Sequence, residues 1–527
     1  MIQTSPLIAA IRAQHPDAQI VLMVRQMAAE AARRTPGVDD VYLYDEDEMF
    51  LDSRAGDSRR MLRAYARAES YANWIRDGGF DLVFNLTHSI ASAMLLAIAE
   101  VPKVVGAHMT DDWRFVLRGP WATYFFTSVM HRTYNDFNLC DSMGRFAGSD
   151  VELSAKPAFT IFDEDRKEAA ALMAEHGLRA GQVFMQLGAS DEHKRWPAEK
   201  FAALARCFGE QGRQTVLVGV KSEQTLGETF DRVAPGLAIS LFGKTELGTL
   251  AALLEQAGCL ITNDTGTMHL AAAVGCPVVL VSVGYVHFRE TGPFGLGHIA
   301  IEAAPGNEIL VEHVVEAMKL CEGVAPSERP AGALHGPMWE KVSAYRSARA
   351  PDGVQTWLPL GNRAPSETDV ARMAYRAMWM REMSTKDNQR ELDESFDLQW
   401  SSYSATAETY ELARKLAGDI EELCSIGSEA SGLARKIRER LERPGRAKEA
   451  QRYVKELIEV EERLRLFGEI HDACRPLVAL AKFERDNIEN APAKALADQT
   501  VGIYTDLTRR AKLLTDYLSN ASRRDGK

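Results

Sequence analysis

The first place in this sequence where chemistry could occur is an apolar run that ends in polar residues and glycine. The segment TNDTGTMHLAAAVGCPVVLV spans residues 262–281 and follows on from the apolar run CLIT at 259–262. We predict that CLIT is a strand and that a helix begins near Thr267. Asn263 to Gly266 then lie at the carboxyl end of a parallel strand, the edge where open α/β sheets bind their ligands.

The start of this predicted helix has the features of an anion site. Asp264 or Thr265 can cap the helix, and Gly266 lets a ligand approach the backbone. The free N–H groups and the positive end of the helix dipole suit a phosphate. His269 follows early in the helix. An ordinary helix start with a capping aspartate is the alternative interpretation of the same residues.

A second loop carries cations at a helix start, where the helix dipole prefers anions. In LGASDEHKRWPAEKFAAL (187–204), Lys194 and Arg195 follow a predicted strand and precede a helix that Pro197 opens. A charge-assisted hydrogen bond contributes about 1.5–3 kcal/mol, which outweighs an unfavourable dipole term of under ~1 kcal/mol. We therefore predict that an anion binds here; a solvated Lys-Arg pair is the alternative.

Four blocks in this order resemble one known family. They are GASDEHKRWPAEKFAALA, LFGKTELGTLAALLEQAG, ITNDTGTMHLAAAVGCPVVLV and ETGPFG. Together they are similar to glycosyltransferase family nine, the ADP-heptose:lipopolysaccharide heptosyltransferases. The likeness extends more weakly towards the amino end, through SPLIAAIRAQHPDAQIVLMV and PGVDDVYLYD. It covers residues 1 to about 322 and excludes the rest of the chain.

The resemblance implies a GT-B fold, in which two Rossmann-like domains face a cleft that holds a nucleotide sugar. It implies inverting transfer of a heptose-like sugar, with ADP-heptose as the expected donor and a lipopolysaccharide core or related glycan as acceptor. No metal and no other cofactor is expected, because cations and helix termini of the protein stabilise the leaving diphosphate in this family.

The resemblance also implies roles for individual residues. Lys194 would contact the phosphates or the sugar, and Asp264 would hold sugar hydroxyls. Thr265 and Gly266 would offer backbone N–H groups to the diphosphate. His269 would line the site, with a helix histidine satisfied by packing as the alternative.

Lys244 and the catalytic base are less well defined. Lys244, in FGKT, is either a second cation near the nucleotide or a solvated turn residue. In the family a first strand precedes a Gly-Asp loop whose aspartate deprotonates the acceptor hydroxyl. Here the residues from Met1 to Pro6 resemble the tail of that loop, so the strand and the catalytic aspartate are absent from this sequence.

Two explanations of this start are expected. Either the chain is given without its first residues, or it is a short form that binds a nucleotide sugar and cannot activate an acceptor. General-base assistance contributes about 10²–10⁴-fold, so such a short form would be nearly silent. Substitute groups in the first domain are few: His88 after a strand, and Asp111 and Asp112 beside Trp113 and Arg114.

Alternating strands and helices position these loops. Short apolar runs separated by helical patterns form two series, one at 19–24, 41–44 and 81–86 and one at 183–188, 214–219, 259–262 and 277–282. These series predict two parallel sheets covered on both faces. Residues 326–365 shift to Pro, Gly and Arg and are typical of an irregular connector. The predicted parts are an acceptor domain that lacks its first strand (1–155), a nucleotide-sugar domain (156–325), a connector (326–400) and a helical hairpin or bundle (401–527).

The last part has helical periodicity and no chemical motif. Apolar residues recur at three- and four-residue steps from Leu412 to Leu441, then through Leu457 to Ile470 and through Ile503 to Leu514, with RPGR at 443–446 breaking the first helix. We predict a packing or oligomerisation module, which could associate with a partner protein.

Composition excludes several classes of protein. Among the 527 residues, 46% are hydrophobic and the net charge is −12, with no basic stripe, so nucleic-acid binding is not expected. The seven cysteines have no metal-ligand spacing and indicate buried thiols in a reducing cytoplasm. No apolar run is long enough to span a bilayer.

A lipid-linked acceptor implies peripheral contact with the inner face of the cytoplasmic membrane. Residues 108–132, which are rich in aromatics and Arg, are a candidate for this contact; a packed loop and helix is the alternative.

Three functions are compatible with this sequence. The first is the glycosyltransferase. The second is a catalytically silent nucleotide-sugar-binding or scaffold protein. The third is a dinucleotide-dependent oxidoreductase, which is disfavoured because no strand runs into GxGxxG.

Overall fold

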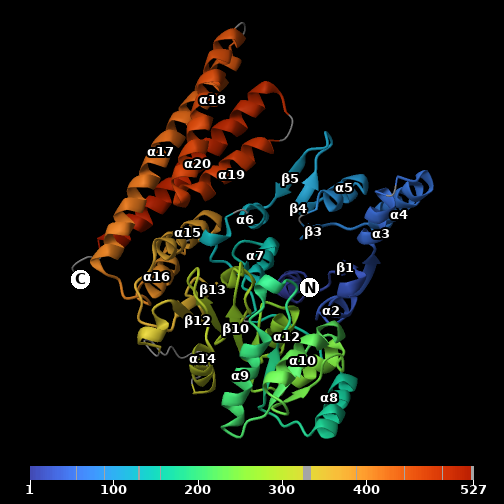
Figure 1. Cartoon of the computed structure of the whole chain (residues 1–527). Coiled ribbons are helices and arrows are strands. Elements are labelled where there is room, and N and C mark those ends of the chain that lie inside the picture. The colour runs from blue at the N-terminus through green and yellow to red at the C-terminus, as the bar shows by residue number, and fades with distance from the viewer. Residues whose placement is uncertain are drawn as a thin grey trace. The chain divides into compact units, whose positions relative to one another are not determined.

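The structure is a computed structural model (Figure 1), and it divides into two compact units. It describes residues 1–527 except 55, 88, 129–130, 155, 324–333, 387, 444–445, 489–490 and 524–527. Unit 1 comprises Met1–Tyr44, Phe137–Arg363 and Ser401–Ser404. Unit 2 comprises Asp45–Asp136, Ala364–Trp400 and Ala405–Lys527. The four-part division at 155, 325 and 400 stays a prediction.

The largest sheet lies in unit 1. Its strands are β6 (Val183–Gln186), β7 (Thr215–Val218), β8 (Ala238–Ser240), β9 (Cys259–Thr262), β10 (Val278–Ser282), β11 (Ile299–Ala303), β12 (Val342–Arg349) and β13 (Gln355–Pro359). The order is β13-β12-β11-β10-β9-β6-β7-β8; β6 to β11 are mutually parallel, and β12 and β13 are antiparallel. The strands predicted at 183–188, 214–219, 259–262 and 277–282 are therefore confirmed as β6, β7, β9 and β10.

Helices cover both faces of this sheet, which explains why its central strands are apolar at nearly every residue. The helices of unit 1 are α1 (Ser5–Gln14), α2 (Ala29–Arg33), α7 (Leu139–Gly144), α8 (Asp163–His176), α9 (Ala198–Gly209), α10 (Gln224–Val233), α11 (Leu247–Glu255), α12 (Gly266–Val274), α13 (Phe288–Thr291) and α14 (Val311–Gly323). Met185 of β6 packs in the same core as Phe201 of α9. Its neighbour Phe184 packs in the opposite core with Leu270 of α12. Successive strand residues point to opposite faces, so α9 and α12 lie on opposite sides of the sheet.

The strands near the amino end form two further sheets. In unit 1, β1 (Val21–Arg25) pairs in parallel with β2 (Asp40–Tyr44). In unit 2, β3 (Val83–Asn85) pairs in parallel with β4 (Val104–Met109), which pairs in antiparallel fashion with β5 (Phe115–Arg118). Within the described chain these five strands belong to two separate sheets.

Unit 2 is largely helical. Its helices are α3 (Glu46–Ser53), α4 (Ser58–Asp77), α5 (Ile90–Ile98), α6 (Pro120–Ser128), α15 (Glu367–Met383), α16 (Gln389–Trp400), α17 (Ala407–Leu441), α18 (Ala447–Ile470), α19 (Arg475–Asp486) and α20 (Ala493–Ser522). Figure 1 shows the long helices α17 and α20 side by side, and their buried faces include Leu423 and Leu507. The three predicted helices are confirmed as α17, α18 and α20, and α19 is additional. Over the residues that can be described, no helix is long and apolar enough to cross a bilayer.

The predicted connector 326–400, expected to be irregular over 326–365, has regular secondary structure in its described part. Its described part contributes β12 and β13 to the main sheet and then forms α15 and α16. The composition of the segment did not predict these strands, because they contain polar residues whose hydrogen bonds are made inside the protein. The backbone N–H of Gln355 donates to Asp141 Oδ2 at 3.0 Å, and the Gln355 side chain accepts from Gly295 N at 2.7 Å. All five residues of β13 are buried.

Candidate functional site

Two loops meet at the carboxyl edge of the main sheet, because the strands before them are parallel neighbours in register. Gln186, the last residue of β6, pairs with Thr262, the last residue of β9. The loop after β6 runs to α9, and the loop after β9 runs to α12. The sequence placed the candidate residues in these two loops, and the structure brings the loops together.

Asn263 joins the two loops from within. Its side chain is fully buried. Asn263 Oδ1 accepts from the backbone N–H of Trp196 at 2.9 Å, and Asn263 Nδ2 donates to the carbonyls of Leu187 at 2.8 Å and Gly188 at 3.3 Å. Buried main-chain groups need such partners, so one amide side chain fixes the distance between the loops.

The two predicted polar side chains of these loops form an ion pair. Lys194 Nζ lies 3.2 Å from Asp264 Oδ2, with 20% and 11% of the two side chains exposed. Lys194 closes the short 3₁₀ turn Glu192–Lys194, which Asp191 caps through its bond from His193 N. Arg195 points elsewhere, because its guanidinium donates twice to the carbonyl of Ala189. Lys194 is therefore the cation of this loop that faces α12.

The amino end of α12 is open. Thr265 is the N-cap residue, and its side chain makes no capping hydrogen bond. It lies 3.3 Å from Thr262 Oγ1 instead. Gly266 is exposed, and a Cβ added there would meet no atom within 4 Å. The first N–H groups of the helix are thus accessible to an anionic group, as an anion site requires.

His269 lies one turn into α12 and is partly buried. Burial lowers its pKa to about 4, so the imidazole is neutral near pH 7. A neutral imidazole can line a binding site or accept a hydrogen bond, but it adds no positive charge to the anion site.

Lys244 is placed differently from the other predicted residues. It follows β8, and its Nζ lies 3.3 Å from His176 Nε2, at the carboxyl end of α8. The structure therefore groups Lys194, Asp264, Thr265, Gly266 and His269 around the start of α12 and places Lys244 against α8.

Sequence reasoning missed a carboxylate at the end of β7. Glu223 Oε2 accepts from Gln186 Nε2 at 2.9 Å, and Gln186 Oε1 lies 3.4 Å from Thr267 Oγ1. A Cβ on Gly188 would lie 1.7 Å from Glu223 Oε1, so a larger residue there would displace this carboxylate. The available signal was position, because Glu223 follows a parallel strand that neighbours β6, just as Asp264 does.

A tyrosine after β10 was missed as well. Tyr285 is 53% exposed, its hydroxyl donates to Asp191 Oδ2 at 2.5 Å, and its ring centre lies 4.9 Å from Lys194 Nζ. This bond lowers the pKa of Asp191 and raises the pKa of Tyr285. A third loop of the same sheet edge thus contacts the lysine.

The candidates in unit 2 do not form a comparable cluster. His88 lies outside the described residues. Asp112 pairs with Arg114 at 3.0 Å, and Trp113 is 56% exposed. In the stretch 108–132, Trp121, Tyr124 and Phe125 are buried, which favours the packed alternative over a surface for an amphiphilic acceptor.

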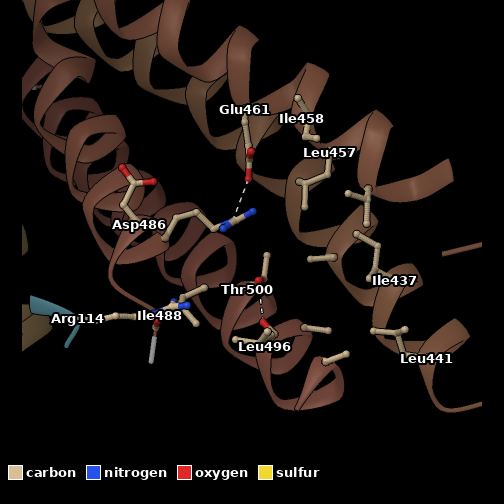
Figure 2. Close-up of a pocket in the computed structure, with 15 residues that line it drawn as sticks. Arg114, Ile437, Leu441, Leu457, Ile458, Glu461, Asp486, Ile488, Leu496 and Thr500 are labelled. Atoms are coloured by element: carbon tan, nitrogen blue, oxygen red, sulfur yellow. Dashed lines mark hydrogen bonds and ion pairs between the residues drawn. The ribbon is translucent and has the colours of Figure 1, made fainter. Parts of the chain in front are cut away.

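One cavity lies within the helices of unit 2 (Figure 2). It has a volume of about 640 Å³ and is walled mainly by apolar side chains of α17, α18 and α20, such as Ile437, Leu457 and Leu496. Glu461 and Arg485 also line it, and Arg485 Nε lies 3.2 Å from Glu461 Oε1. Of the residues singled out in the sequence, Arg114 lines this cavity. It supplies no group arranged for transfer chemistry.

Residues 70–298 match glycosyltransferase family 9 (heptosyltransferase), and this range contains all five residues grouped at the start of α12. Lipopolysaccharide heptosyltransferase 3 of Escherichia coli K12 is 23% identical over 344 residues, which are 62% of this chain and 92% of that protein. Lipopolysaccharide heptosyltransferase 2 of Salmonella typhimurium is 22% identical over 289 residues, which are 53% and 78% of the two chains.

Solved structures give similar matches. The ADP-heptose lipopolysaccharide heptosyltransferase II of E. coli superposes with a TM-score of 0.46 at 18% identity, over 61% of this chain and 95% of that one. A family 9 glycosyltransferase of Veillonella parvula gives a TM-score of 0.48 at 22% identity, over 61% and 93%.

The family match and the sheet topology support the same assignment. The predicted α/β class with an α-helical C-terminal module is confirmed, and the GT-B arrangement stays a prediction. Residues 70–298 are therefore similar to glycosyltransferase family 9 (heptosyltransferase), and this similarity supports a glycosyltransferase enzyme.

Proposed function

We propose that this protein transfers a heptose-like sugar from an ADP-activated donor to a lipopolysaccharide core or a related glycan, with inversion and without a metal. The observation that carries the proposal is the pairing of Lys194 with Asp264 beside the open amino end of α12. Relatives of similar sequence are heptosyltransferases of lipopolysaccharide, which supports the sugar and the acceptor class.

The site suits the leaving group of such a reaction. The acceptor oxygen attacks the anomeric carbon as the bond from that carbon to the diphosphate oxygen breaks on the opposite side, and the acceptor proton passes to a base. Negative charge then builds up on the diphosphate. Lys194 and the free N–H groups at Thr265 and Gly266 stabilise this charge, and Asp264 accepts hydrogen bonds from sugar hydroxyls.

The acceptor side of the proposal follows from the chemistry of the acceptor. A lipid-linked glycan is presented at a membrane surface, so we propose a cytoplasmic enzyme with peripheral contact at the inner face. The association of the helical module with a partner protein stays a prediction.

Nucleotide binding by the full chain tests the proposal. Calorimetry should detect ADP binding to the wild type, and Lys194→Met should weaken it about 10- to 100-fold, since a charge-assisted hydrogen bond contributes about 1.5–3 kcal/mol. Lys200→Met is the matched control, because Lys200 on α9 pairs with Glu308 at 2.8 Å and not with Asp264. Its affinity should stay within twofold of wild type.

Turnover separates the two functions. Release of ADP from ADP-heptose with an acceptor present, unchanged by EDTA and with the product anomer inverted by NMR, supports the transferase. Binding of ADP-heptose without any release of ADP supports the silent binding protein instead. Absence of nucleotide binding refutes both.

A further inference from the structure

Tyr285 is the second side chain, after Asp264, that contacts the Lys194 ammonium. Asp264 Oδ2 lies 3.2 Å from Nζ on one side, and the Tyr285 ring centre lies 4.9 Å from Nζ. A cation within about 6 Å of an aromatic ring is attracted by the negative face of the ring. Tyr285 comes from the loop after β10, whereas Lys194 and Asp264 follow β6 and β9, so three loops of one sheet edge meet at this ammonium.

The backbone is built to bring Tyr285 to this position. Gly284 has a φ of +70°, and a Cβ there would lie 2.2 Å from the carbonyl oxygen of His193. Only glycine allows that approach, so the two loops touch through main-chain atoms. The Tyr285 hydroxyl then donates to Asp191, the residue that caps the turn carrying Lys194.

The two partners of Lys194 differ in how much of its positive charge stays available to a ligand. A carboxylate neutralises the ammonium, and in the proposed function Asp264 must also accept hydrogen bonds from the sugar. An aromatic ring holds the ammonium without carrying a net charge. A lysine held by the ring therefore keeps its full charge for a phosphate when Asp264 turns to the sugar.

We propose that Tyr285 is a positioning residue, which holds the Lys194 ammonium against the diphosphate of the nucleotide-sugar donor. This inference rests on the proposed function. It predicts that Tyr285 matters for ligands with phosphates and matters little for the nucleoside alone.

The experiment compares ADP with adenosine on the full chain. Tyr285→Leu keeps apolar bulk but removes the ring, and should weaken ADP binding about 3- to 10-fold, in the range of an exposed to partly buried cation–π contact. Adenosine affinity should stay within twofold. Tyr285→Phe keeps the ring, loses only the bond to Asp191, and should retain ADP affinity within about twofold.

A double-mutant cycle shows whether Tyr285 acts through the lysine. In a Lys194→Met background, Tyr285→Leu should cause no further loss of ADP affinity. Additive losses, equal losses for ADP and adenosine, or a Phe variant as weak as the Leu variant would each overturn the inference. If the wild type binds ADP and Tyr285→Leu binds it equally well, the inference alone fails. If the wild type binds no nucleoside diphosphate, the proposed function fails and this inference falls with it.

Discussion

Buried polar side chains occur in two regions of the molecule, and they have different partners in each. In the loops after β6 and β9, the buried Asn263 bonds main-chain atoms, and the partly exposed Lys194 and Asp264 form an ion pair between the loops. In the helical part of unit 2, buried charges pair with one another. Arg376 of α15 lies 3.1 Å from Asp136, with 2% and 4% of the side chains exposed.

Charged side chains also pair between other helices of unit 2. Arg510 of α20 lies 3.2 Å from Glu382 of α15 and 3.0 Å from Glu484 of α19. Such pairs favour particular neighbouring helices and one register along the helix axes, because a shifted helix would bury an unpaired charge. The loops have another task. They are held in a fixed geometry and keep the Lys194 ammonium partly exposed, where a ligand can reach it.

The largest expected effect is on the helical region. Arg376→Met leaves Asp136 buried with Gln399 Nε2 at 2.7 Å and without this cation, and should lower the free energy of unfolding by about 3–5 kcal/mol. The control is Arg390→Met, since Arg390 is 84% exposed in an i,i+4 pair with Glu394 at 2.8 Å, and should cost under about 0.5 kcal/mol. Calorimetric melting of the full chain measures both. Equal losses would show that the buried pair has no special weight.

Acid should affect unit 1 through a neutral buried group. His298 is 5% exposed, and burial lowers its pKa to about 4. The unfolded chain has a histidine pKa near 6.5, so between pH 6.5 and 4 the unfolded state binds more protons, and stability falls as pH falls. Below pH 4 the resulting loss in the free energy of unfolding, relative to neutral pH, reaches about 3 kcal/mol.

His298→Gln tests this dependence. Stability measured by denaturation at pH 7 and pH 4.5 should fall about 2–3 kcal/mol more in the wild type than in the variant. An equal fall in both would mean that the imidazole becomes protonated in the folded state at no cost, and the contrast between neutral and charged buried groups would lose this support.

The sequence predicts those parts of the fold in which one physical pattern dominates. Strands β6, β9 and β10 are continuous apolar runs because both faces are covered, and α17 is periodic because one face is buried. Strands β12 and β13 escape prediction, because their buried Ser347, Thr356 and Gln355 have no apolar signature. Their hydrogen-bond partners come from distant parts of the chain.

The site is predictable to the same extent. NDTG and the Lys-Arg pair mark the two loops, since polar residues after parallel strands face a common edge. Which cation faces α12 depends on loop closure: Arg195 folds back on Ala189, and Lys194 does not. The contact of Tyr285 with Lys194 depends on the close approach at Gly284, which no local pattern announces.

The smallest of the three effects tests the loops themselves. Asn263→Ala removes the partner of Trp196 N–H and of two carbonyls, so it should cost about 2 kcal/mol of stability, the penalty of leaving buried polar groups unpaired. Because the loops would no longer be held together, ADP affinity should fall as well.

Asn307→Ala is the matched control. Asn307 is exposed and bonds the carbonyls of Ala304 and Pro305, and its loss should stay within about 0.5 kcal/mol without changing ADP binding. A stable Asn263→Ala variant with wild-type ADP affinity would mean that Lys194 and Asp264 alone hold the loops in place. The assignment of a structural role to the neutral amide and a binding role to the two charges would then be wrong.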